Sequence, residues 1–174
     1  DNIRKVAARY KTEVNYPRGL GEQLRTIAQL IHGDFGTRVF YVETGGFDTH
    51  ANQTGTHGRT LDGIANAIAA FHKDLTSKGL GDKVTTMCFS EFGRRVQQNS
   101  SNGTDHGAAG PMFLVGGKVK GGLHGQYPSL TELDGGDLKY TVDFRQVYAT
   151  LLDKWLAADS TPVLGGKFDA IDVL

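Results

Sequence analysis

Two short apolar segments, separated by a stretch of helical periodicity, restrict the choice of fold more than any other part of the sequence. Residues 38–43 and 84–89 have the length and composition of buried strands. Between them, the apolar residues from 61 to 75 recur every three or four positions, as in an amphipathic helix. Because a strand, a helix and a second strand in this order form a right-handed parallel unit, the sequence predicts the α/β class.

The other elements expected from the sequence fit the same class. Helical spacing begins at Leu20, residues 112–115 predict a short strand, and the glycine pairs in 116–122 predict a hairpin. Asp143 is a suitable N-cap for a last helix. We see no internal boundary and expect residues 1–174 to form a single α/β domain.

Charge and length exclude several classes of function. The chain has 174 residues, enough for one domain with a hydrophobic core, and its 19 basic residues are balanced by 19 acidic ones. This balance argues against binding to nucleic acid or to an acidic membrane surface. No apolar stretch approaches the roughly 18 residues of a membrane span. Any anionic ligand would be held locally, by a metal ion or by individual arginines.

Polar residues follow the two predicted parallel strands. Asp48 and His50 come after the first strand in the segment TGGFDTH, and side chains two residues apart in an extended chain leave on the same side. Glu91 follows the second strand, and Asp105 and His106 lie farther along the same loop. Loops at the carboxyl ends of neighbouring parallel strands converge, so we expect these side chains to surround one point.

Carboxylate and imidazole ligands together suit zinc, manganese or iron, and two such ions can clamp a phosphoryl or sulfuryl group. Arg94 offers a planar guanidinium that matches an oxyanion. Simpler interpretations stay open. Asp105 and His106 could form only a turn, Glu91 could be a structural partner of Arg94 or Arg95, and the polar loops could serve only to hold a glycine-rich fold together.

Several motifs in order resemble a known family. They are GGFDTH at 45–50, SEFGR at 90–94, GTDHG at 103–107 and the helix start DFRQVY at 143–148. Over residues 16–168 the chain resembles the bacterial family of proteins of unknown function DUF1501.

That resemblance implies a place in the alkaline phosphatase and sulfatase superfamily. It implies a three-layer α/β/α sandwich with a mostly parallel sheet, in which metal ligands follow the strands. Asp48 and His50 would take the place of the superfamily's first Asp and His ligands, and Asp105 with His106 would correspond to its Asp-His pair. Longer family members often carry a twin-arginine export signal, which implies an extracytoplasmic location.

Two departures from the superfamily pattern matter for function. The second strand is followed by SEFG and not directly by Asp-His, which predicts that a second metal is lost or rearranged. The match also covers only the C-terminal half of longer members, whereas the superfamily's nucleophile lies in the N-terminal half. We therefore expect a fragment or shortened relative that associates with the missing half or with copies of itself.

The resulting prediction is a metal-dependent hydrolase that acts on a small anionic phosphate or sulfate ester. Arg94 would steady the anion, and Glu91 is the second predicted catalytic residue. The metal, zinc or manganese, would be bound by Asp48, His50, Glu91, Asp105 and His106. The alternative is a non-catalytic extracytoplasmic protein with a degenerate site, which binds a ligand or self-assembles.

Overall fold

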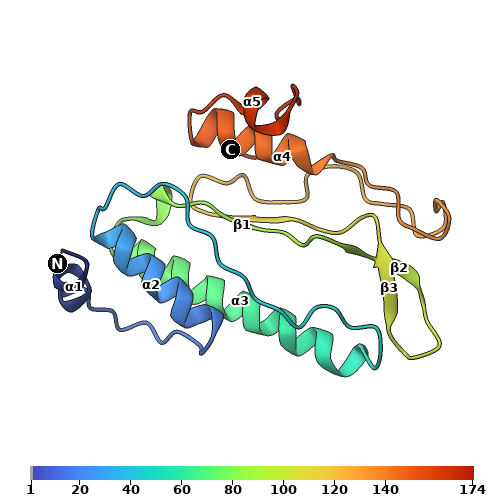
Figure 1. Ribbon diagram of the computed structural model, residues 1–174, viewed down its shortest axis with the longest axis horizontal. Helices are drawn as coiled ribbons and strands as arrows, with labels where there is room; N and C mark the ends of the chain where they lie inside the picture. Colours follow the sequence, from blue (N-terminus) through green and yellow to red (C-terminus); the bar gives the residue numbers. More distant parts are fainter. Residues whose placement is uncertain (1) are drawn as a thin grey trace. The chain divides into compact units, whose positions relative to one another are not determined.

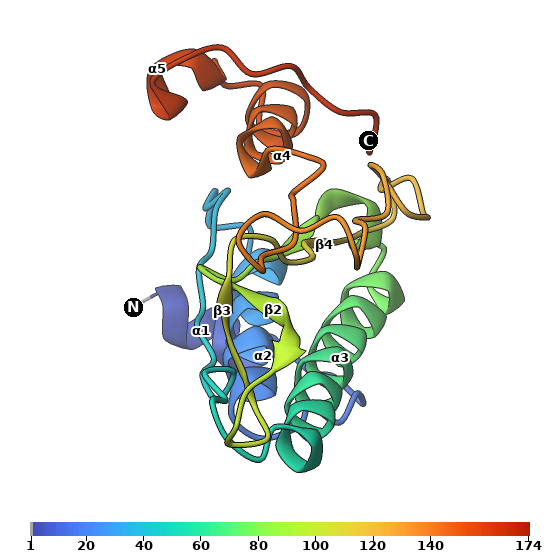
Figure 2. The same cartoon turned by 90° about the vertical axis from the view of Figure 1, so that its right-hand side faces the viewer.

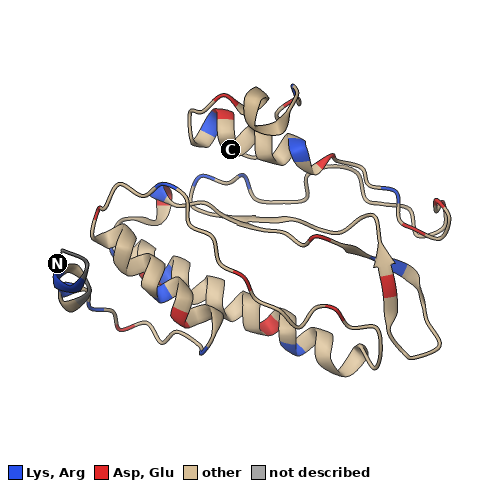
Figure 3. Cartoon of the chain, viewed as in Figure 1, with Lys and Arg blue, Asp and Glu red and all other residues tan. Residues whose placement is uncertain are grey.

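The computed structural model describes residues 2–174, which form two compact units (Figures 1 and 2). The first extends to Val84 and includes Ser100–Gly103, and the second consists of Thr85–Asn99 and Thr104–Leu174. Basic and acidic residues alternate along much of the chain (Figure 3). Among the described residues, none of the helices combines the length and the apolar character that a bilayer crossing requires.

The first unit is helical. It contains α1 (Asn2–Arg9), α2 (Leu20–His32), α3 (Thr54–Ser77) and a 3₁₀ turn, η1 (Gly81–Lys83). Figure 1 shows α2 and α3 side by side and running in the same direction. The helix predicted to begin at Leu20 and the one predicted over 61–75 are therefore confirmed, although α3 begins earlier than its apolar periodicity indicates.

The hydrophobic core of this unit lies between α2 and α3. Five of its buried residues come from the two helices, and Tyr10 comes from the segment that follows α1. The six residues are Tyr10, Leu24, Ala28, Ala67, Phe71 and Leu75. Burying side chains of the size of Leu75 or Phe71 contributes about 1.5–3 kcal/mol each. The helical periodicity thus defines the packing of this unit.

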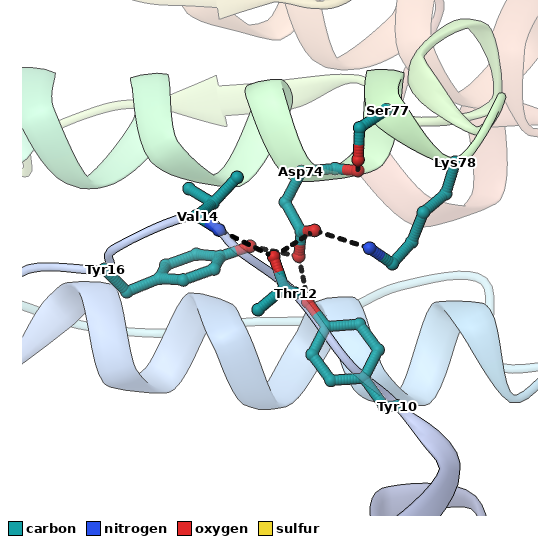
Figure 4. A network of polar contacts seen from close by, with 7 residues as sticks. All are labelled: Tyr10, Thr12, Val14, Tyr16, Asp74, Ser77 and Lys78. Atoms are coloured by element: carbon teal, nitrogen blue, oxygen red, sulfur yellow. Dashed lines mark hydrogen bonds and ion pairs between the residues drawn. The ribbon is translucent and has the colours of Figure 1, made fainter.

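A buried carboxylate sits at the edge of this core (Figure 4). Asp74 on α3 is fully buried and accepts hydrogen bonds from the hydroxyls of Tyr10, Thr12 (2.6 Å) and Tyr16 (2.8 Å). Lys78, one turn farther along α3, forms an ion pair with it at 2.8 Å. These bonds fasten the segment between α1 and α2 to α3.

The second unit contains two separate two-stranded antiparallel sheets. One pairs β1 (Thr86–Cys88) with β4 (Phe113–Val115), and the other pairs β2 (Gly93–Gln98) with β3 (Thr104–Gly107) (Figure 2). The β2–β3 ladder contains an irregularity between residues 94 and 98. Burial at β1 raises the pKa of the Cys88 thiol.

Short helices complete the second unit. They are α4 (Phe144–Thr150), a π-helical turn η2 (Leu151–Trp155) and α5 (Ser160–Leu164). The predicted N-cap is confirmed, because the Asp143 carboxylate accepts the Arg145 amide at 2.9 Å.

The prediction of a three-layer α/β/α sandwich with a mostly parallel sheet is wrong. In the described residues every ladder is antiparallel and no sheet has more than two strands. Residues 38–43, expected to be a buried strand, belong to neither sheet, and Val39 and Tyr41 are each 67% exposed. Without this strand, the parallel unit expected between residues 38 and 89 does not form. Val42 instead packs against the helical core.

Candidate functional site

The segment that precedes α3 brings a carboxylate and an imidazole together. The Nε2 atom of His50 lies 2.9 Å from Oδ1 of Asp48, and the two side chains are 49% and 65% exposed. Between them, the Thr49 amide donates to the Phe47 carbonyl at 2.9 Å, which makes a tight turn. Local backbone geometry therefore places the two polar side chains next to each other at the surface.

A glycine shapes this turn, and two contacts hold it against the start of α3. Gly46 has a φ of 94°, a conformation that favours glycine. The Gln53 side-chain amide donates to the Thr49 hydroxyl at 2.9 Å. The ring of Phe47 meets the ring of His57 edge to face at 6.3 Å. The segment is thus anchored on both sides of the Asp48–His50 pair.

The tip of the β2–β3 hairpin belongs to the same compact unit as this segment. The amides of Asn52 and Gln53 donate to the carbonyls of Ser101 and Asn102 at 3.0 and 2.9 Å. These backbone bonds couple the hairpin tip to the start of α3.

Gly103, the first glycine of the GTDHG motif, is required by this packing. A Cβ atom at this position would lie 2.2 Å from the carbonyl carbon of His50 and 2.6 Å from the amide nitrogen of Ala51. No side chain fits at that distance. The glycine therefore allows the backbone of the tip to approach the backbone of the Asp48–His50 turn.

The hairpin carries a group of three stacked side chains in the second unit. His106 pairs with Arg94 across the ladder. The His106 ring lies parallel to the ring of Phe92, with centroids 3.9 Å apart and planes 6° apart. The guanidinium carbon of Arg94 lies 4.9 Å from the centre of the same ring, and its NH1 group donates to the Thr104 carbonyl.

The other predicted residues have different surroundings. Asp105 accepts a hydrogen bond from Asn99 at 3.1 Å, and neighbours in a strand point to opposite faces, so Asp105 does not share the face of His106. Glu91 is exposed just before β2. Arg95 forms an ion pair with Asp137 at 3.1 Å, so its contact is structural.

The structure thus pairs Asp48 with His50 and groups Arg94 with His106, and the ligand roles of Glu91 and Asp105 stay predictions. Sequence reasoning missed Phe92 and Gln53. Phe92 stands in the SEFGR motif, but nothing in the sequence gives the register that brings it to His106. Gln53 could have been found, because it stands four residues after Thr49, within reach of a local side-chain hydrogen bond.

The fold and these side chains define a small two-unit protein that presents an exposed Asp-His pair and a hairpin with a stacked histidine. The chain belongs to the family described as protein of unknown function (DUF1501), whose sequence model matches residues 4–166. The family resemblance seen in the sequence is therefore confirmed. No curated protein and no solved structure matched the chain.

Proposed function

We propose that Asp48, His50 and His106 bind a divalent metal ion, zinc or manganese, and that the chain uses this site to hydrolyse phosphate or sulfate esters. The observation that carries the proposal is the Asp48–His50 pair. Its ligand atoms are 2.9 Å apart. Metal–ligand bonds of about 2.0–2.2 Å place adjacent ligands about 3 Å from each other, so the pair has the spacing of two ligands of one ion.

Chain connectivity supports His106 as the third ligand. Gly103 packs against the His50 backbone, and His106 follows it by three residues. Three residues of extended chain span at most about 11 Å, so only a short stretch of chain joins His106 to the glycine that contacts His50. Two imidazoles and one carboxylate leave a coordination position open, as in catalytic zinc sites.

The donor set suits hydrolysis more than structural metal binding. A bound divalent ion polarises an ester oxygen and lowers the pKa of a coordinated water. Asp48 supplies a negative charge to the site, and the hydrogen bond from Gln53 to Thr49 holds the turn that presents it. The catalytic roles of Glu91 and Arg94 remain predictions.

Kinship with the alkaline phosphatase and sulfatase superfamily and an extracytoplasmic location belong to the same proposal. Both rest on the motif resemblance. Fractionation of the cells that make the protein tests the location directly, and recovery only from the cytoplasm would contradict it.

Metal analysis of protein purified without chelator tests the site. We expect wild-type protein to retain zinc or manganese and Asp48→Asn and His106→Gln to lose it. His72→Gln, which changes a half-buried histidine on α3, is the matched control and should retain the metal. Equal metal content in all four proteins would contradict the assignment of these ligands.

Turnover of an aryl phosphate and an aryl sulfate tests the activity. Metal-dependent turnover that Asp48→Asn abolishes would support the hydrolase. Metal binding without turnover would favour the second candidate, a non-catalytic binding or self-assembling protein. The exposed aromatic side chains of the second unit, such as Phe144 (54% exposed) and Phe113 (55%), are the observation that favours it.

A further inference from the structure

The stacked group on the β2–β3 hairpin has a geometry that a surface histidine does not need. The ring centroids of His106 and Phe92 are 3.9 Å apart, and the ring planes are nearly parallel. Most aromatic pairs have centroid distances of about 4.5–7 Å. Arg94 pairs with His106 across the ladder and places its guanidinium against the same Phe92 ring. Arg94 of β2, His106 of β3 and Phe92, which lies just before β2, thus form one stacked group.

We propose that Phe92 is a positioning residue, which fixes the plane of the His106 imidazole for metal binding. This inference rests on the proposed metal site. Stacking covers a face of the imidazole, whereas a metal ion binds a ring nitrogen in the plane of the ring, so the two contacts do not compete. Metal-bound histidines are usually oriented by a hydrogen bond to the second nitrogen, and stacking fixes the ring plane without using either nitrogen.

Arg94 holds this arrangement in place. Its NH1 group donates to the carbonyl of Thr104, two residues before His106 on the opposite strand. The same guanidinium lies 4.9 Å from the Phe92 ring centre, within the range of a cation–π contact. Arg94 therefore acts on His106 through Phe92 and through the backbone of β3. Lysine cannot make both contacts, because it lacks the planar, multiply donating head group.

Glycines on the hairpin let the stack form. Gly93 and Gly107 face each other in the ladder, and a Cβ on Gly107 would lie 2.8 Å from the Arg94 carbonyl carbon. A Cβ on Gly93 would lie 1.8 Å from the Ala109 carbonyl oxygen. The SEFGR and GTDHG motifs therefore supply the stacked side chains together with the backbone that allows the strands to approach each other.

The test compares Phe92→Leu, which removes the aromatic face, with Phe92→Tyr, which keeps it. Phe113→Leu, an exposed phenylalanine of β4, is the matched control. Two quantities are measured on the full chain. They are the zinc affinity, from competition with a chromophoric chelator, and the NMR shifts of the His106 ring protons without metal, assigned with His106→Gln. Circular dichroism checks that each variant is folded.

We expect the His106 ring protons of wild-type protein to be shifted upfield by the Phe92 ring current, and we expect Phe92→Leu to abolish this shift. The zinc affinity of Phe92→Leu should fall about 10–100-fold, the usual effect of losing a group that orients a metal ligand. Phe92→Tyr and Phe113→Leu should bind zinc like the wild type. Arg94→Lys should weaken binding in the same direction as Phe92→Leu.

The outcomes separate this inference from the proposed function. If folded Phe92→Leu loses the upfield shift but keeps wild-type zinc affinity, the positioning role is overturned and the metal site stands. If the wild-type protein binds no zinc, both proposals fall. A Phe92→Tyr variant that binds zinc as poorly as Phe92→Leu would also overturn the positioning role, because the aromatic face would then not be the property that matters.

Discussion

Replacement of Asp74 by asparagine should destabilise the first unit strongly. Asp74 is fully buried, and each of its oxygens accepts two contacts. Oδ2 takes the hydroxyls of Tyr10 and Tyr16, and Oδ1 takes the Thr12 hydroxyl and the Lys78 ammonium (Figure 4). All four partners are donors. An asparagine amide would turn an NH₂ group toward two of them, whichever way it is placed.

The expected loss follows from these contacts. The charged acceptor of all four contacts is replaced by a neutral group, and hydrogen bonds to a charged group contribute about 1.5–3 kcal/mol each, compared with about 0.5–1.5 kcal/mol for neutral ones. Lys78 would also lose the partner of its ion pair, but its side chain is 19% exposed and can turn toward water. We therefore expect the free energy of unfolding to fall by about 3 kcal/mol. For a chain of this length this lowers Tm by about 6–12 °C.

Urea unfolding followed by circular dichroism measures this change. Asp62→Asn is the matched control, because Asp62 lies on the same helix with its side chain exposed, and it should change the free energy of unfolding by less than about 0.5 kcal/mol. If Asp74→Asn and Asp62→Asn are equally stable, the network of Figure 4 does not hold the N-terminal segment to α3.

Further predictions follow from single positions. Gly103→Ala should lower the free energy of unfolding by about 1–3 kcal/mol, because its Cβ would overlap the His50 backbone. Gly63→Ala, which has open space around it on α3, should raise the free energy of unfolding by about 0.5–1 kcal/mol. Urea unfolding compares the two variants. Asp143→Ala should destabilise α4 by about 1 kcal/mol and Asp143→Asn by less, as measured by amide exchange. The hydrogen bond from Arg145 lowers the pKa of Asp143, so the charged cap is present at neutral pH and is lost as the pH falls through that lowered pKa. Burial raises the pKa of Tyr16 from 10.0 to about 12, so the unfolded chain loses this proton first and stability should fall as the pH rises between these values. The ultraviolet absorbance of tyrosinate should show a transition near pH 12 that Tyr16→Phe removes.

Local signals in the sequence were sufficient for the helices. The apolar spacing from Leu20 predicted α2, and Asp143 predicted the start of α4, because periodicity and N-caps act within a few residues. The earlier start of α3 has no apolar signal, since residues 54–60 are mostly exposed. These residues are ordered by the hydrogen bonds of Asn52 and Gln53 to the hairpin tip, which are distant in sequence.

The strands could not be predicted in the same way. An apolar run becomes a strand only where it joins a ladder of hydrogen bonds, and residues 38–43 belong to neither of the two sheets. Conversely, β2 (sequence GRRVQQ) lacks apolar alternation and still pairs with β3, because Gly93 and Gly107 allow close approach. The error in fold class arose at these two places.

The part of the candidate site that depends on neighbouring residues was predictable, and the part that depends on strand register was not. Asp48 and His50 are two residues apart, and a single turn brings them together, so their spacing carried the information. The contact of His106 with Phe92 depends on the register of a hairpin that the sequence does not reveal. Residue types alone therefore suggested metal ligands, but they gave no register for the hairpin that carries Asp105 and His106.

Zinc X-ray absorption spectroscopy of the loaded protein tests the central claim most directly, because it counts imidazole ligands. Our proposal predicts two imidazoles and an oxygen ligand with bond lengths of about 2.0–2.2 Å in the wild-type protein, and one imidazole fewer in His106→Gln. A wild-type protein that retains no zinc, or a ligand count that His106→Gln leaves unchanged, would contradict a metal site formed by Asp48, His50 and His106.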